Sequence, residues 1–242
     1  MKIDNFNMWI AFSVFPFYLF SLWKRPLLYV GLILQVLYLG LRGISLERLP
    51  LVGPHDTLAF LSASIVAFSI PIDYFLKRQS KFLSGIAITS AIFTVFSLIS
   101  KQHNTPLPPV LKIIWFELHV VLAFLSYALF AIAAVAGILY LKKEDNFEGI
   151  QYKSILLGYS FFSLSMIFGG IWAYLAWGTY WLWTPKELWT TILWIFYSLY
   201  LHARLRQKWY GRPAAILGTA GFGVVMFTYL GVSLLMKSSH TF

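Results

Sequence analysis

The stretch that decides the fold is IWFELHVVLAFLSYALFAIAAVAGILYL, which runs from Ile114 to Leu141. It contains one Asp, Glu, Lys or Arg residue, Glu117, close to its start, and most of its other side chains are apolar. A helix that crosses the hydrocarbon core of a bilayer needs about 20 consecutive, predominantly apolar residues. The stretch therefore predicts a transmembrane helix.

Similar apolar runs occur along the whole chain. Its 242 residues are 59% hydrophobic and only 12% charged, and the mean hydropathy is +0.72. Soluble domains carry about 25% charged residues. The runs therefore predict an all-α fold, a polytopic integral membrane bundle of about eight transmembrane helices. The expected spans are residues 8–23, 26–41, 57–75, 82–100, 114–141, 155–175, 188–203 and 213–236.

The first two expected spans and the seventh are short for a full crossing, and the first two could instead form one tilted or partly immersed hairpin. Lys24 and Arg25 follow the first apolar run, whereas a cleaved signal peptide has its basic cluster in front, so we expect a true first span. The connecting segments are short. We expect one membrane-embedded domain over residues 1–242, with the characteristic motifs in 114–242 and weaker ones in 1–113.

The formal net charge of +10 comes from basic residues that lie in short clusters between the apolar runs. In this position they orient helices, because loops on the cytoplasmic side carry an excess of Lys and Arg. We therefore expect no nucleic-acid partner. The loops of one side hold 12 basic residues, and those of the other side hold 7. The richer set is Lys24, Arg25, Lys77, Arg78, Lys81, Lys142, Lys143, Lys153, Arg204, Arg206, Lys208 and Arg212. Assigning it to the cytoplasmic side places both termini and the segment 177–187 on the outer side.

That outer segment is rich in aromatic residues. WGTYWLWTPKELW, residues 177–189, has four tryptophans and a tyrosine within thirteen positions: Trp177, Tyr180, Trp181, Trp183 and Trp189. One interpretation is an interfacial aromatic belt, since Trp and Tyr gather at bilayer edges. At this density we favour a surface on which an extended flat ligand stacks. Thr184, Pro185 and Glu187 predict a helix start directly after the loop, with Thr184 and Glu187 forming a capping box.

Histidines are expected on the same side of the membrane. His119 lies near the outer end of one span, and His240 lies just beyond the outer end of the last one. Taken singly, an interfacial histidine is usually a solvated side chain. As a pair beside the tryptophans, two neutral imidazoles could ligate haem iron from both axial positions. The chain has no cysteine, so any thiol in the chemistry comes from a partner.

His202 belongs to a different depth. It follows Trp189 by thirteen residues, about 20 Å of helix, in a membrane core about 30 Å thick. An ionisable residue at such a depth suggests a role in a transport pathway. The sequence therefore permits a second ligand position within the membrane.

Longer segments resemble a known family. WGTYWLWTPKELWTTILWIFYSLYLHAR, residues 177–204, resembles the signature of the CcsA (ResC) family of cytochrome c biogenesis proteins, WGxYWxWDPKExW followed by a span that ends in YLHxR. The end of the chain, residues 227–240, is similar to the family's YxGVNLLxxGLH, and residues 118–120 resemble its other outer histidine segment. Thr184 stands where the family has aspartate, which favours capping as the main role of that position.

The resemblance implies a membrane subunit of a System II type cytochrome c haem lyase or synthetase. In such proteins the outer histidine pair, here His119 and His240, holds haem b as a transported substrate at the tryptophan-rich loop. The span histidine, here His202, receives haem earlier, beside a CcsB (ResB) partner that supplies another histidine. Apocytochrome c then presents its CxxCH thiols. We expect Lys186 to pair a haem propionate.

We expect the bacterial inner (cytoplasmic) membrane, with the Trp-rich loop on its outer side, and keep the thylakoid membrane as the alternative. Three other functions stay open at this point. A CcmC-like carrier would deliver haem to a chaperone. A HemX-like protein would act in tetrapyrrole-pathway regulation. A transporter or structural membrane subunit would carry its tryptophans only as an aromatic belt.

Overall fold

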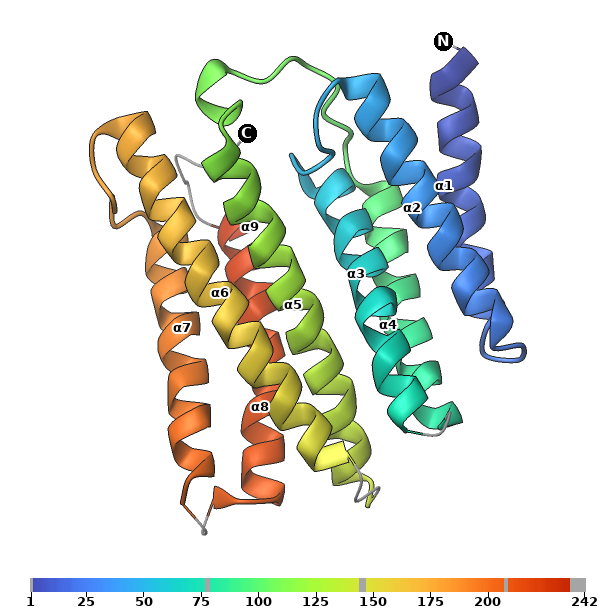
Figure 1. Cartoon of the computed structure of the whole chain (residues 1–242), viewed down its shortest axis with the longest axis vertical. Coiled ribbons are helices and arrows are strands. Elements are labelled where there is room, and N and C mark those ends of the chain that lie inside the picture. The colour runs from blue at the N-terminus through green and yellow to red at the C-terminus, as the bar shows by residue number, and fades with distance from the viewer. Residues whose placement is uncertain (1, 77–78, 144–146, 207–208, 236–242) are drawn as a thin grey trace. The chain divides into compact units, whose positions relative to one another are not determined.

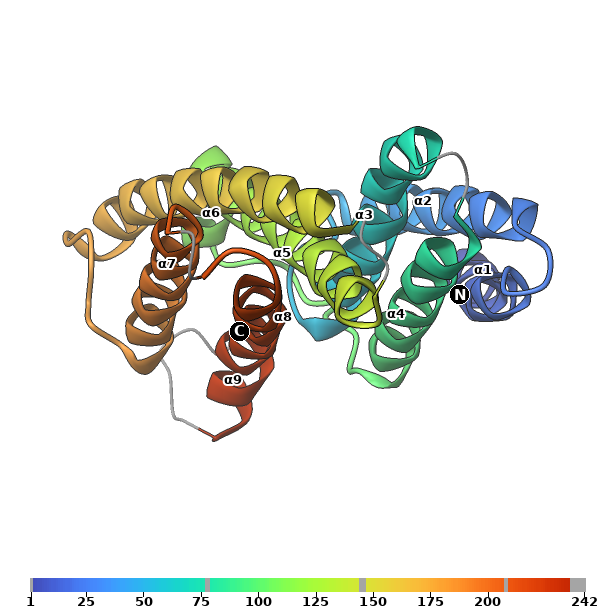
Figure 2. The same ribbon diagram turned by 90° about the horizontal axis from the view of Figure 1, so that it is seen from below.

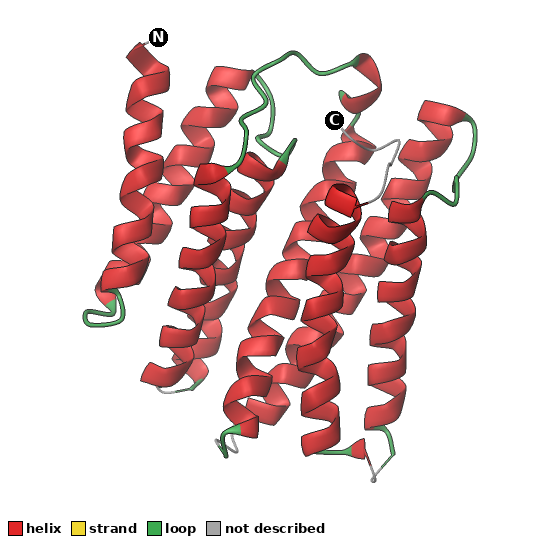
Figure 3. Ribbon diagram, turned by 180° about the vertical axis from the view of Figure 1, so that it is seen from behind, coloured by secondary structure: helices red, strands yellow, loops and turns green. Residues whose placement is uncertain are grey.

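A computed structural model describes residues 2–76, 79–143, 147–206 and 209–235, and all regular secondary structure in these ranges is helical (Figures 1 and 3). The chain forms two compact units, residues 1–107 and residues 108–242. Each unit has its own core and is described by itself. The expectation of one membrane-embedded domain stays a prediction.

The first unit is a bundle of four helices in which α3 packs on α4, and α1 packs on α2 and α4. The helices are α1 (Lys2–Phe20), α2 (Pro26–Leu46), α3 (Pro54–Phe75) and α4 (Ser80–Ile99). Proline occupies the first position of α2 and of α3, where its missing N–H costs no hydrogen bond. Helix α2 continues to Leu46, five residues beyond the expected end, and stops where Glu47 adopts a left-handed conformation with φ 52°.

The second unit is organised around its longest apolar helix, α5, which packs against α6 and α8, while α7 packs against α8 and α6 (Figures 1 and 2). Its elements are the short turn η1 (Pro109–Leu111), α5 (Ile114–Leu141), α6 (Glu148–Trp177), α7 (Pro185–Arg204), α8 (Arg212–Met226), the π-helical segment η4 (Phe227–Gly231) and α9 (Val232–Leu235).

Close contacts between α5, α6 and α8 depend on small residues. A Cβ atom added at Gly137 of α5 would meet the side chains of Gln151 and Thr219. The Gln151 amide donates a hydrogen bond to the Ala215 carbonyl at 3.1 Å, which ties α6 to α8 inside the bundle. Small residues and buried polar side chains of this kind are the usual means of helix association in membranes.

The predicted all-α membrane class is confirmed. Six described helices are long and apolar enough to cross a membrane: α2 to α6, and α8 together with η4. The other two expected spans are also helical, but the apolar part of α1, Met8–Phe20, is shorter, and α7 is outside this group of six. A total of eight crossings therefore stays a prediction for α1 and α7.

Candidate functional site

The aromatic loop begins where α6 stops. Gly178 takes φ 75°, a left-handed conformation that glycine adopts without steric cost, and its N–H bonds the Tyr174 carbonyl at 2.8 Å. The chain then turns back so that the ring of Tyr180 stacks on the ring of Tyr174, with centroids 4.6 Å apart and planes 14° apart. The loop is thus anchored on the last turn of α6.

The start of α7 confirms the predicted capping box. The Glu187 N–H donates to the Thr184 hydroxyl at 3.4 Å, and the Thr184 N–H donates to Oε2 of Glu187 at 2.9 Å. Sequence reasoning missed a further bond, in which the Leu182 N–H donates to the same Oε2 at 2.9 Å. The buried Glu187 carboxylate therefore holds the loop as well as the helix.

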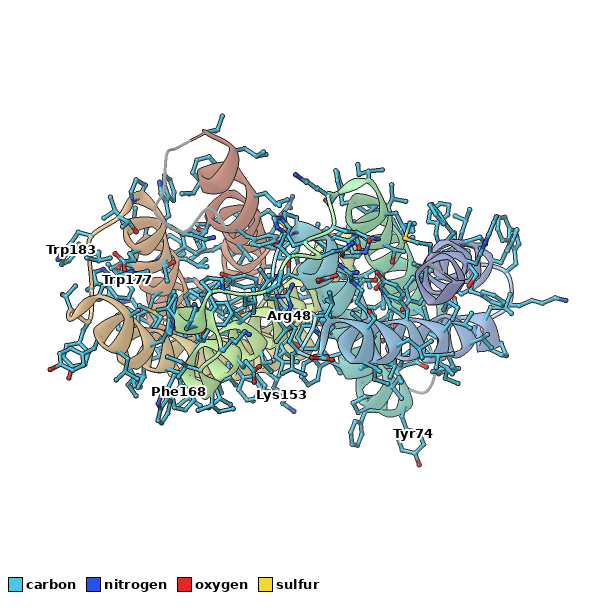
Figure 4. The ribbon with its side chains drawn as sticks, turned by 90° about the horizontal axis from the view of Figure 1, so that it is seen from above. Arg48, Tyr74, Lys153, Phe168, Trp177 and Trp183 are labelled. Carbon is cyan, nitrogen blue, oxygen red and sulfur yellow. The ribbon has the colours of Figure 1, made fainter. Side chains whose placement is uncertain are left out.

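Trp183 lies between the two amides that Glu187 holds. Its backbone has φ 58°, in the left-handed region that a bulky residue rarely enters. Its side chain is 70% exposed. Figure 4 shows Trp183 at the margin of the second unit, in the loop that joins α6 to α7.

His119, on the second turn of α5, lies against α6. Its Nδ1 donates a hydrogen bond to the Ser165 carbonyl at 2.8 Å, and the Ser165 hydroxyl donates to the His119 carbonyl at 2.8 Å. The ring fits only because residue 169 is glycine, since a Cβ there would lie 2.6 Å from Nδ1. With its proton on Nδ1, the neutral ring keeps a lone pair on Nε2, the state that a metal ligand requires. No described residue makes a hydrogen bond to that Nε2.

One tryptophan is beside this imidazole, and a second packs on the first. Trp172 is buried and nearly parallel to the His119 ring, with centroids 6.5 Å apart and planes 13° apart. Trp177 meets Trp172 edge to face at 4.8 Å. The Trp172 indole is fixed because its Nε1 donates to the Val110 carbonyl at 2.8 Å. Lys186, near the start of α7, lies within electrostatic range of His119.

The remaining aromatic residues divide into smaller groups. Trp189 packs edge to face on Phe227 of η4 at 4.4 Å, and its carbonyl accepts a hydrogen bond from Thr228 at 3.5 Å. The Thr179 hydroxyl donates to the Trp181 carbonyl at 3.2 Å, which braces the loop. The structure thus brings Trp172 to His119 and Trp177 to Trp172, while Tyr180 and Trp189 pack on separate neighbours.

His202 is exposed on α7. Its Nδ1 donates to the Ser198 carbonyl at 2.8 Å, so its Nε2 also keeps a lone pair. The exposed residues Leu188, Ile195 and Leu199 lie on the same face of the helix. An imidazole on an exposed apolar stripe is expected to have a partner outside the chain.

The C-terminal end of α7, just after His202, is fixed by a cluster that sequence reasoning missed. Arg204 forms an ion pair with Glu148 of α6 at 2.6 Å and lies 3.9 Å over the ring of Tyr152. This cluster holds the end of α7 against the start of α6. The other predicted axial ligand, His240, lies outside the described residues.

His55 of the first unit differs from these two histidines. Its Nδ1 donates to the Ser97 carbonyl at 2.8 Å, and its Nε2 accepts from the Tyr38 hydroxyl at 2.5 Å. Both nitrogens are therefore engaged, and the ring has no lone pair left for a metal. This difference agrees with the choice of His119 and His202 as candidate ligands.

Comparison with known proteins confirms the resemblance. Residues 52–240 match the family described as Cytochrome C assembly protein. The chain belongs to this family. The match begins with α3, well before the segment at 114–242 in which the motifs are clearest.

Curated relatives are named as cytochrome c biogenesis protein CcsA. The protein from Chlamydomonas reinhardtii is 32% identical over 90% of this chain and 67% of its own length. Those from Trieres chinensis and Prochlorococcus marinus (strain MIT 9215) are 30% and 31% identical, over 97% and 80% of this chain and 91% and 75% of their own lengths. The chain is thus a CcsA-family membrane subunit of cytochrome c biogenesis.

Proposed function

We propose that this chain binds haem b at the end of α5 and α6 that adjoins the Trp-rich loop, with His119 as one axial ligand and His240 as the other, and presents it to apocytochrome c. The observation that carries the proposal is the state of His119. Its Nδ1 is committed to the Ser165 carbonyl, while its Nε2 has no described partner, and its ring lies beside Trp172, on which Trp177 packs.

The surroundings of His119 suit a porphyrin. Aromatic side chains offer flat surfaces against which the macrocycle can stack, each contact burying a large area at small entropic cost. Lys186 lies within electrostatic range of the imidazole and can pair with a propionate at the edge of the ring. Ligation by two histidines fills both axial positions, which limits reaction of the carried iron with oxygen.

In this proposal the chain supplies orientation rather than a reactive group. Each CxxCH thiol of the apocytochrome adds across a haem vinyl group: sulfur bonds one vinyl carbon, and the thiol hydrogen ends on the other. The addition needs no external oxidant or reductant. Holding haem and thiols together raises their effective concentration, and this proximity is the chain's contribution. We propose that haem attachment takes place at this surface, in either the bacterial inner membrane or a thylakoid membrane.

His202 serves as an earlier haem position in the same scheme. Its exposure on an apolar stripe of α7 favours a second ligand from a CcsB-like membrane partner. The clamp between Arg204 and Glu148 keeps the end of this helix in place while haem is transferred.

Haem titration of the purified chain in detergent tests the proposal. We expect a six-coordinate, low-spin spectrum for the wild type, and for His119→Ala a loss of the low-spin form that added imidazole restores. His103→Ala is the matched control, because His103 is another half-buried histidine but belongs to the first unit. A protein that takes up no haem would favour the aromatic-belt function. Haem loading of a chaperone without CcsB would favour the carrier function.

A further inference from the structure

The loop that carries Trp183 is organised by one buried carboxylate. Glu187 is only 8% exposed, and its Oε2 accepts two backbone hydrogen bonds, from Leu182 and from Thr184, each at 2.9 Å. These two donors are the residues on either side of Trp183. A single oxygen atom therefore fixes the backbone before and after this tryptophan.

These two hydrogen bonds to one oxygen atom have a consequence for the backbone conformation. The two N–H groups can converge on Oε2 only if the residue between them curls, and Trp183 has φ 58°. A left-handed conformation is unfavourable for a residue with a Cβ, so it persists only where the surroundings enforce it. In this backbone conformation Trp183 is 70% exposed, at the margin of the second unit (Figure 4).

Helix capping does not account for the arrangement. A capping box needs the bond from Glu187 to the Thr184 hydroxyl and the bond from Thr184 to the Glu187 carboxylate, and both are present. The bond from Leu182 lies outside that box and stabilises no turn of α7. It acts on the loop, at the position where the backbone is least favourable.

We propose that Glu187 is a positioning residue that presets the Trp183 indole for stacking on haem, an inference that rests on the function proposed above. Because the curl of the loop is formed before the ligand arrives, the ligand does not have to order it, and such preorganisation increases affinity. A carboxylate suits this task, since an ionised acceptor makes the stronger hydrogen bonds and lies here at the positive end of α7.

A double-mutant cycle in purified protein tests the assignment. Glu187→Ala and Trp183→Ala are each expected to weaken haem binding by about fivefold to tenfold, the loss of one aromatic stacking contact. If Glu187 acts through Trp183, the double variant binds haem no more weakly than Trp183→Ala alone. The low-spin spectrum should persist in all three variants, because the His119 contacts are unchanged.

Two further variants separate positioning from helix capping. Thr184→Ala removes the hydroxyl of the capping box but keeps the backbone N–H that bonds Glu187, so it should bind haem like the wild type. Glu187→Gln keeps an acceptor oxygen and should recover most of the affinity that Glu187→Ala loses. If Glu187→Ala does not fold, Glu187→Asp, whose shorter side chain cannot reach both amides, replaces it in the cycle.

The outcomes distinguish this inference from the proposed function. A wild type that takes up no haem contradicts the function itself. A wild type that binds haem, with losses from Glu187→Ala and Trp183→Ala that add in the double variant, overturns the positioning role alone. The same conclusion follows if Thr184→Ala loses as much affinity as Glu187→Ala, because capping would then explain both.

Discussion

His55 of the first unit and His119 of the second make the same kind of hydrogen bond from Nδ1, but their Nε2 atoms have different surroundings. Each lies near the start of an apolar helix and donates from Nδ1 to a backbone carbonyl of a neighbouring helix at 2.8 Å. The Nε2 of His55 accepts from the Tyr38 hydroxyl, whereas that of His119 has no described partner. The comparison shows that Nε2, rather than burial or the Nδ1 bond, separates a structural histidine from a candidate ligand.

The surroundings extend this contrast. The neighbour of His55 along α3 is Asp56, whose carboxylate pairs with the buried Arg42 guanidinium at 3.0 Å. Beside His119 is the ring of Trp172, which is in turn packed against Trp177. Both units use buried polar side chains to hold helices together, and the second unit also leaves Nε2 of His119 without a described partner.

The largest effect is expected in the first unit. Asp56→Ala leaves the Arg42 guanidinium, which is 5% exposed, without its carboxylate. Breaking a buried pair from one side costs about 3–5 kcal/mol of stability. The midpoint of thermal unfolding in detergent should fall strongly in Asp56→Ala. The double variant Arg42→Met with Asp56→Leu should recover much of this loss. The folded variant should keep the wild-type haem spectrum. A changed spectrum would show that this polar pair of the first unit also affects haem ligation.

The second effect tests the fit of His119 against α6. Gly169→Ala places a Cβ atom 2.6 Å from Nδ1 of His119, so the ring must shift and lose its bond to the Ser165 carbonyl. Loss of such a supporting contact weakens metal binding by about tenfold to hundredfold. Haem titration measures the change.

Gly170→Ala is the matched control for Gly169→Ala. A Cβ at Gly170 would lie 3.7 Å from the Tyr180 carbonyl, an ordinary contact, so the affinity should stay the same. Equal losses in the two variants would show that the helix, rather than the imidazole, is sensitive to the added methyl group.

Much of the fold follows from local sequence. Eight apolar runs predict helices that the structure contains, and the TPKE sequence predicts the capping box at Thr184 and Glu187. Helix ends were less accurate. Helix α6 begins at Glu148, seven residues before the expected start, because polar residues such as Gln151 and Ser154 are buried inside the unit and do not meet lipid. Hydropathy alone does not distinguish such residues from a loop.

The candidate site shows the same division. His119, His202 and the aromatic loop were found from residue type and spacing. The contacts of His119 with Ser165 and Gly169 were not, since these residues are remote in the chain and small or hydroxyl-bearing residues are common in membrane helices. The left-handed backbone of Trp183 was also missed, because only glycine and asparagine announce that conformation in a sequence.

The smallest effect sharpens the comparison of the two histidines. Tyr38→Phe removes the hydroxyl that donates to Nε2 of His55 and leaves the Nδ1 bond to Ser97 in place. Loss of one buried hydrogen bond costs about 1 kcal/mol, so a modest drop in thermal stability is expected. The variant also removes the short hydrogen bond to Nε2 of His55 and leaves only the longer contact from the Gln102 amide, at 3.4 Å, so that the ring becomes more like that of His119. If the loss of this hydrogen bond were sufficient for ligation, the variant would bind one more haem per chain than the wild type. We expect the same haem stoichiometry as in the wild type, because His55 is 1% exposed and lies beside the buried Arg42–Asp56 pair, which leaves no room for a porphyrin. An additional haem bound in the titration would show that losing the short hydrogen bond to Nε2 is enough to make a histidine a ligand.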